Sequence, residues 1–140
     1  PVNPALAWHK ICCSFRRAAM SNKRIVIVDD DESIRKTFFL LLVSKYNVYL
    51  ARDAAEALDR FKKADIDLIV VDFRLPGKNG LQMIQDFRQS GYEGKAVLIS
   101  AFPDQIKPEE IQKLKIDCLF TKPLDLKALT GTIDLLLGQP

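Results

Sequence analysis

Three acidic residues stand directly after two short apolar runs of this sequence. Asp29 and Asp30 follow residues 25–28, and Asp72 follows residues 67–71. Carboxylates that crowd together repel one another, by about 4 kcal/mol per pair at 4 Å with an effective dielectric constant of 20. They relieve this repulsion by shifting their pKa, by pairing with a cationic side chain or by binding a metal ion. An all-oxygen ligand set favours Mg²⁺, so these residue types predict a magnesium site.

A hydroxyl group and an ammonium group follow two further apolar runs. Ser100 stands after residues 95–99, and Lys122 stands two positions after the run at 116–120. A carboxylate can itself attack phosphorus and form an acyl phosphate. Mg²⁺ and these two side chains would then share the charge of the phosphoryl oxygens. The combination therefore indicates phosphoryl chemistry on a carboxylate.

Five strands must position these residues, because a helical apolar pattern follows each of the short runs. The runs are apolar throughout rather than alternating, which is typical of a parallel sheet covered by helices on both faces. We expect strands at 24–28, 47–51, 67–71, 95–99 and 116–120, and helices at 33–45, 54–63, from 81, from 108 and at 125–137. The predicted fold class is α/β, a doubly wound (βα)₅ domain with a five-stranded parallel sheet. Ligands of such sheets bind at the carboxyl ends of the strands, where the polar residues stand.

Charge and residue counts exclude several other kinds of site. The net charge of +3 comes from residues 1–22, which carry three basic side chains and no acid, so residues 23–140 carry 18 of each sign. A neutral domain is a poor candidate for direct nucleic-acid binding. The single histidine, His9, precludes a zinc site or a Ser-His-Asp triad within residues 23–140. No apolar stretch approaches the roughly 20 residues of a membrane span.

Residues 1–22 differ from the remainder and are expected to form a non-native or disordered N-terminal extension before a domain at 23–138. We interpret Met20 as the natural start and the residues before it as upstream or expression sequence. The alternative is a short basic arm that contacts a membrane surface or a partner. Three cysteines, with Cys118 in an apolar run, do not suggest a disulfide framework, which suits a reducing cytoplasm.

Four blocks resemble the receiver domain of bacterial two-component response regulators, and the chain is similar to the single-domain chemotaxis type. They are IVIVDDD (25–31), VDFRLPGKNG (71–80), LISA (98–101) and TKP (121–123), all in order at the ends of strands. The resemblance covers residues 23–138. It implies a flavodoxin-like strand order 2-1-3-4-5 and a phosphorylation-dependent switch with only self-catalysed phosphoacceptance and autodephosphorylation, rather than an enzyme.

The resemblance also assigns metal-binding and phosphoryl-binding roles. Asp72 would accept the phosphoryl group, and Mg²⁺ would be bound by Asp30, Asp72 and the backbone carbonyl of Arg74, with Asp29 acting through a metal-bound water. The phosphoryl group would be bound by the Ser100 hydroxyl, the Ala101 N–H and Lys122. A cis Lys122–Pro123 bond, as in the family, would direct Lys122 into the pocket. Asp31 and Asp53 are expected to be solvated or to cap helices, a role that also stays open for Asp29.

Two departures from the family pattern concern the switch and the pocket mouth. The family often has an aromatic residue three positions before the lysine, where this chain has Leu119, with Phe120 predicted on the opposite side of the strand. Leu119 and Ser100 are therefore the candidate switch residues. Arg74 and Phe102 are expected at the pocket mouth, where their bulk would hinder an attacking water.

The resemblance implies a sensor histidine kinase or a histidine phosphotransfer protein as the phosphodonor. The surface of the fourth and fifth helices would bind a downstream protein or form a homodimer once Asp72 is phosphorylated. The sequence stops after the last helix, so we expect a stand-alone messenger or the receiver part of a longer protein. Two alternatives stay open: a degenerate receiver that serves only as a protein-interaction module, and a small aspartyl-nucleophile phosphatase. Arg74 stands where the phosphatase would need its second acid.

Overall fold

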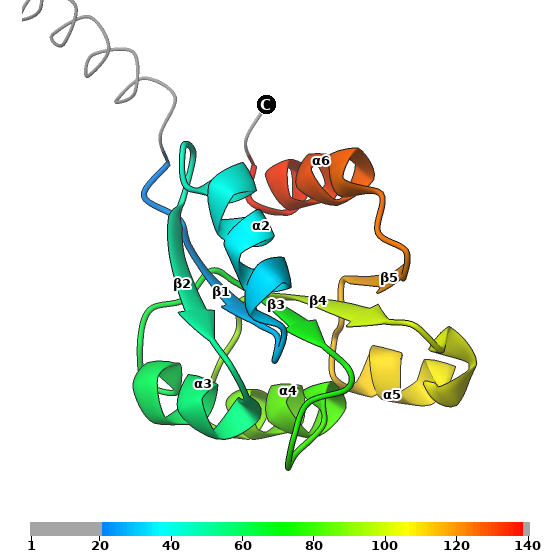
Figure 1. Cartoon of the computed structure of the whole chain (residues 1–140). Helices are drawn as coiled ribbons and strands as arrows, with labels where there is room; N and C mark the ends of the chain where they lie inside the picture. The colour runs from blue at the N-terminus through cyan, green and yellow to red at the C-terminus, as the bar shows by residue number, and fades with distance from the viewer. Residues whose placement is uncertain (1–20, 139–140) are drawn as a thin grey trace, which may run out of the picture.

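Five parallel strands lie at the centre of the computed structural model, which describes residues 21–138 (Figure 1). They are β1 (Arg24–Val28), β2 (Asn47–Ala51), β3 (Leu68–Asp72), β4 (Lys95–Ser100) and β5 (Cys118–Thr121). Their order in the sheet is β2-β1-β3-β4-β5. The predicted fold class and strand order are therefore confirmed. Apart from Ser21 and Asn22, the predicted N-terminal extension lies outside the described residues.

Helices cover both faces of the sheet. They are α2 (Glu32–Leu42), α3 (Ala54–Phe61), α4 (Gly80–Gln89), α5 (Pro108–Lys113) and α6 (Leu126–Leu136), with one 3₁₀ turn, η1 (Pro103–Gln105), before α5. In Figure 1, α2 and α6 lie above the sheet, and α3, α4 and α5 lie below it. Within residues 21–138, no helix combines the length and the apolar character that crossing a membrane requires.

Two apolar cores form because successive side chains of a strand point to opposite faces. In β1, Ile25 and Ile27 belong to the core shared with α2 and α6. Val26 and Val28 belong to the core shared with α3 and α4. Burial of each such side chain stabilises the fold by about 1.5–3 kcal/mol. Both faces of the central strands are thus buried, so only the strand ends are left to carry polar chemistry.

Side-chain caps begin four of the helices. Asp31 accepts a hydrogen bond from the N–H of Ser33, and Asp53 accepts one from Glu56, as the predicted capping role requires. Asn79 and Asp125 begin α4 and α6 in the same way. Each cap satisfies an N–H that has no partner within its own helix.

Several predicted boundaries are wrong by one to three residues. The helix expected at 33–45 ends at Leu42, because the N–H groups of Lys45 and Tyr46 both donate to its carbonyl and close a turn into β2. The strand expected at 116–120 begins at Cys118, because Ile116 donates to the carbonyl of Ile111 and still belongs to the end of α5. A similar turn, in which the N–H of Ala64 donates to the carbonyl of Phe61, ends α3 at Phe61, and β3 spans 68–72 instead of 67–71.

Candidate functional site

The register of the sheet brings the polar strand ends to one edge. Val28 pairs with Val71, so Asp29 and Asp72 both come directly after this pair. Ser100 pairs with Thr121, so Lys122 follows immediately beyond Ser100. The edge therefore combines residues from four segments that are far apart in the sequence.

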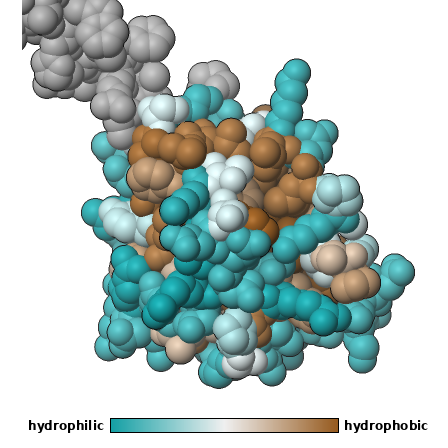
Figure 2. All heavy atoms as spheres, in the orientation of Figure 1, coloured by the Kyte–Doolittle hydropathy of each residue, from teal (hydrophilic) through white to brown (hydrophobic). Residues whose placement is uncertain are grey.

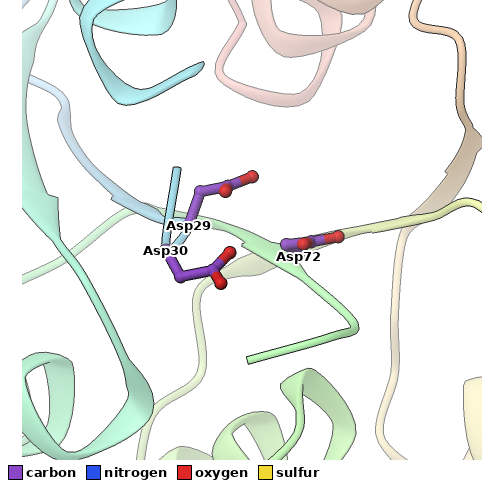
Figure 3. Close-up of side chains that lie close together, drawn as sticks. All are labelled: Asp29, Asp30 and Asp72. Carbon is purple, nitrogen blue, oxygen red and sulfur yellow. The ribbon is translucent and has the colours of Figure 1, made fainter. Parts of the chain in front are cut away.

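Three carboxylates gather at this edge, as the spacing predicted (Figure 3). Asp29, Asp30 and Asp72 each offer an oxygen, and these oxygens lie within 4.8 Å of one another. Asp29 is only 2% exposed and Asp72 only 6%, whereas Asp30 is exposed. The cluster thus has two carboxylates embedded in the protein and one on its solvent side.

Burial makes the charged form of both embedded carboxylates costly. Loss of hydration raises the pKa of Asp29 to about 6, although a hydrogen bond from the Asp31 N–H opposes the shift. Loss of hydration also raises the pKa of Asp72, against the attraction of the Lys122 ammonium. The Asp72 charge raises the pKa of Asp29 further, as expected for crowded carboxylates. A cation bound among them would relieve both the repulsion and the desolvation.

Lys122 provides the positive charge nearest to Asp72. Its Nζ lies 3.4 Å from Oδ1 of Asp72. Its backbone N–H donates to the carbonyl of Ser100 over 3.0 Å, and the Lys122–Pro123 peptide bond is cis, as predicted. The structure therefore brings together Asp72 and Lys122, which are 50 positions apart in the sequence.

Ser100 is almost fully buried at the end of β4, with 2% exposure. Its Oγ accepts a hydrogen bond from the N–H of Phe102 over 3.0 Å. The hydroxyl hydrogen is left to donate to an oxygen in the pocket, because this bond uses only an oxygen lone pair. Ala101, whose N–H was the other candidate for phosphoryl binding, lies in the exposed connection that follows.

The first residue of α4 comes very close to the phosphoacceptor candidate. Gly80 donates its N–H to the carbonyl of Phe73 over 2.8 Å. A Cβ atom at Gly80 would lie 2.6 Å from the carbonyl oxygen of Asp72, closer than real Cβ contacts come. The absence of a side chain here lets α4 begin directly behind Asp72.

Arg74 and Phe102, the two residues expected at the pocket mouth, contact each other. The guanidinium carbon of Arg74 lies 5.0 Å from the ring centroid of Phe102, which is a cation–π geometry. Arg74 is exposed and the Phe102 side chain is 52% exposed. This stack joins the connection after β3 to the connection after β4.

The candidate switch residue Leu119 is half-buried, away from the acidic cluster. It packs on the core that includes Leu98 and Ile106, whereas Phe120 packs on the core shared with α2 and α6. The prediction that these neighbours point to opposite sides of β5 is confirmed. Cys118, predicted to be buried, is half-buried, and burial raises the pKa of its thiol.

Arg35 is a site residue that the sequence interpretation missed. Its Nη1 donates to the backbone carbonyl of Asp29 over 2.6 Å, from the beginning of α2. The available signal was a basic residue five positions after the pair Asp29-Asp30. The helical pattern alone gave it no role, because a basic side chain off the apolar face usually points to solvent.

The donor set fits a hard divalent cation. Three carboxylate oxygens within 4.8 Å of one another, one of them on an exposed residue, are suitable for Mg²⁺, which prefers oxygen ligands and retains several waters. Arg74, whose backbone carbonyl is the further expected ligand, stands two positions after Asp72 in the connection that follows β3.

The model of the response regulator receiver domain family matches residues 25–134. The chain belongs to this family. As a receiver domain, it is 30% identical over 94 residues to response regulator RR06 from Streptococcus pneumoniae, an alignment that covers 67% of this chain and 43% of that protein. The chain thus spans less than half of the length of this curated relative.

Solved receiver domains have the same architecture. The response regulator TrrA from Thermotoga maritima, solved in complex with Mg²⁺-BeF, is 26% identical with a TM-score of 0.72, covering 81% of this chain and 98% of that one. A CheY-like receiver domain from Methanospirillum hungatei has a TM-score of 0.75 at 24% identity, covering 84% and 95%, and supports the fold alone. The family match and the shared architecture together identify residues 25–134 as a response regulator receiver domain.

Proposed function

We propose that this receiver domain accepts a phosphoryl group on Asp72, with Mg²⁺, from a histidine kinase or a histidine phosphotransfer protein. One observation carries the proposal: Asp72 is buried beside two other carboxylates while the Lys122 ammonium lies 3.4 Å from its Oδ1. A purely structural Asp–Lys pair would have no need of two further carboxylates, which only add repulsion.

Mg²⁺ would be held by Asp30, Asp72 and the backbone carbonyl of Arg74, with Asp29 one water away. The clustered carboxylate oxygens support this assignment, and so does the Mg²⁺-BeF complex of TrrA. When bound, the ion supplies positive charge against the phosphoryl oxygens.

In the transfer, Oδ of Asp72 forms a bond to phosphorus while the phosphorus–nitrogen bond of the phosphohistidine breaks. The electron pair of that bond leaves with the imidazole nitrogen, so the product is an acyl phosphate on Asp72. Lys122 exchanges its contact with the Asp72 carboxylate for one with a phosphoryl oxygen. The Ser100 hydroxyl and the Ala101 N–H donate to the other oxygens.

The connection after β4 carries the signal outward. The Ser100 Oγ already accepts from Phe102 in this connection, so a hydrogen bond from Ser100 to a phosphoryl oxygen would pull on it directly. None of the six residues of α5, which follows, is buried, so its position is weakly determined by packing. The surface of α5 and α6 would then bind the downstream protein or a second copy, with Leu119 repacking beneath it.

A protein rather than a small molecule is the natural phosphodonor. Helix α2, the connection before α6 and the first residue of α6 form an apolar cleft of about 150 Å³, lined by Ser33, Ile34, Thr37, Phe38, Leu124 and Leu126. Leu124 stands two positions after Lys122. Figure 2 shows apolar side chains exposed over α2 and α6. Such a surface suits a helical partner that presents its phosphohistidine to the edge.

We further propose that the functional unit comprises residues 23–138, with residues 1–22 outside it, and that it acts in the cytoplasm, where kinases hold their phosphohistidine. The alternative is a degenerate receiver that only binds proteins. The aspartyl-phosphatase alternative is weaker, because exposed Arg74 offers no general acid at its position.

Intact-mass measurement of the domain incubated with Mg²⁺ and acetyl phosphate tests the proposal. We expect one added phosphoryl group, lost in Asp72→Asn and in EDTA but retained in Asp65→Asn, which alters an exposed carboxylate before β3. Titration with beryllofluoride then detects a pocket whose phosphorylated form is short-lived. Failure of both measurements would contradict phosphoacceptance and favour the interaction module.

A further inference from the structure

The guanidinium of Arg35 donates a hydrogen bond to a backbone carbonyl of the acidic cluster. Its Nη1 donates to the carbonyl of Asp29 over 2.6 Å, which is short for such a bond. Within residues 21–138, its guanidinium forms no ion pair with a carboxylate, although acidic residues surround this turn. This half-buried arginine therefore contacts the backbone at Asp29 rather than a carboxylate, which suggests that its role concerns the backbone of the cluster.

The carbonyl that Arg35 binds belongs to the peptide bond between Asp29 and Asp30. This unit is planar, so its orientation fixes where the Cα of Asp30 lies and where its side chain begins. Asp29 is held independently, because its Oδ1 accepts a hydrogen bond from the N–H of Asp31 over 2.9 Å. The carboxylate of Asp30 has no hydrogen-bond or ion-pair partner among the described residues. Its placement therefore depends on the peptide that precedes it.

We propose that Arg35 is a positioning residue for the magnesium site: it locks the Asp29–Asp30 peptide so that the exposed carboxylate of Asp30 points toward Asp29 and Asp72. This inference rests on the proposed function, because it gives Asp30 its importance as a metal ligand. Groups that orient metal ligands without touching the metal typically alter affinity by 10–100-fold. Removing the Arg35 donor should leave all the metal ligands present, but the carboxylate of Asp30 should no longer be held in one orientation.

The test is the Mg²⁺ affinity of the full chain, measured by calorimetry and, with Mn²⁺ as a probe, by electron paramagnetic resonance. Arg35→Met keeps the aliphatic stem and removes the donor, and we expect it to weaken Mg²⁺ binding by about tenfold. Arg35→Lys, which keeps one charged donor, should recover part of the loss. Lys36→Met is the matched control, since it removes a neighbouring positive charge whose partner is only Glu32, 3.3 Å away.

A double-mutant cycle separates positioning from a general effect of charge or stability. If Arg35 acts through Asp30, then Arg35→Met should cost much less affinity in an Asp30→Asn background than in the wild type. Equal costs in both backgrounds, or equal losses in Arg35→Met and Lys36→Met, would overturn the inference. Circular dichroism and urea unfolding verify that each variant is folded; should Arg35→Met unfold, the same cycle is carried out with Arg35→Lys.

The same data distinguish failure of this inference from failure of the proposed function. If the wild type binds no Mg²⁺, the proposed function itself is contradicted. If the wild type binds Mg²⁺ and the Arg35 variants bind it equally well, only the role of Arg35 is wrong.

Discussion

The Nζ atom of Lys122 lies 3.4 Å from Oδ1 of Asp72, although their strands, β5 and β3, are separated in the sheet by β4. The contact crosses the end of β4, where the carbonyl of Ser100 accepts a hydrogen bond from the backbone N–H of Lys122. The Lys122 side chain thus connects Asp72, the proposed phosphoacceptor, to the end of β5, an edge strand of the sheet. A change of charge at Asp72 would therefore alter the position of Lys122 and, through it, the end of β5.

Replacement of Lys122 by methionine should slow phosphorylation more than it affects folding. The ammonium lowers the pKa of Asp72 and, in the proposed function, would stabilise charge on the phosphoryl oxygens, so its loss should reduce the initial rate by about tenfold or more. The rate is measured by intact mass during incubation with acetyl phosphate. Lys127→Met, on the exposed side of α6, serves as the control. An unchanged rate in Lys122→Met would contradict the role of this contact.

The raised pKa of Asp29 predicts that the metal-free domain loses stability as the pH rises. Asp29 has a pKa of about 6 in the folded domain against an ordinary 3.8, so the folded state binds the proton more tightly. The contribution of protonated Asp29 to the free energy of unfolding is fully present below the ordinary pKa. It is lost as the pH rises through about 6. The raised pKa of Asp72 acts in the same direction.

Urea unfolding in EDTA at about pH 5 and about pH 7 measures this effect. Asp29→Asn should be more stable than the wild type at the higher pH, by on the order of 1–3 kcal/mol, and the gap should shrink at the lower pH. Mg²⁺ should restore the wild type at the higher pH and have a smaller effect on the variant. If the difference in unfolding free energy between Asp29→Asn and the wild type did not depend on pH, ionisation of Asp29 would not be what destabilises the folded domain.

The architecture could be predicted from the sequence because strong, simple signals determine it. Apolar runs such as 25–28 and 68–71 are short, β-branched and apolar throughout, and only a sheet buried on both faces accommodates them. The same topology places every strand end at one edge, so Asp29, Asp72 and Lys122 could be brought together before any coordinates were known. The resemblance to the family supplied the expected roles of these residues, which spacing alone does not determine.

Other features depend on three-dimensional contacts that leave little trace in the sequence. The carbonyl bond of Arg35 requires the exact path of the turn after β1. Asp134 accepts hydrogen bonds from the hydroxyl of Tyr46 and from Lys45, which fastens α6 to the end of α2 over some 90 positions. The ends of α2 and β5 differ from the prediction for the same reason. Hydrogen bonds to the carbonyls of Leu42 and Ile111 close turns there, whereas the apolar pattern of the sequence continues through them.

Substitution of Gly80 by alanine should destabilise the domain and displace Asp72. The new Cβ would lie 2.6 Å from the Asp72 carbonyl oxygen, so either α4 or the end of β3 must move. We expect a loss of about 1–3 kcal/mol in the free energy of unfolding, together with slower phosphorylation. Gly131→Ala is the matched control in α6, where nothing lies within 4 Å, and should gain up to about 1 kcal/mol. Equal effects of the two substitutions would contradict the close approach.

The stack of Arg74 on Phe102 should prolong the life of the phosphorylated state. It joins the connections after β3 and β4, with the guanidinium carbon 5.0 Å from the ring centroid, and we expect its bulk to hinder a water that attacks the phosphorus. Arg74→Ala and Phe102→Ala should each shorten the phosphoryl half-life by about threefold to tenfold, and the double variant should add little because both break one contact. Gln105→Ala, exposed in η1, is the control. Half-lives from intact mass after removal of the phosphodonor decide the matter, and unchanged values in both single variants would exclude a shielding role for the stack.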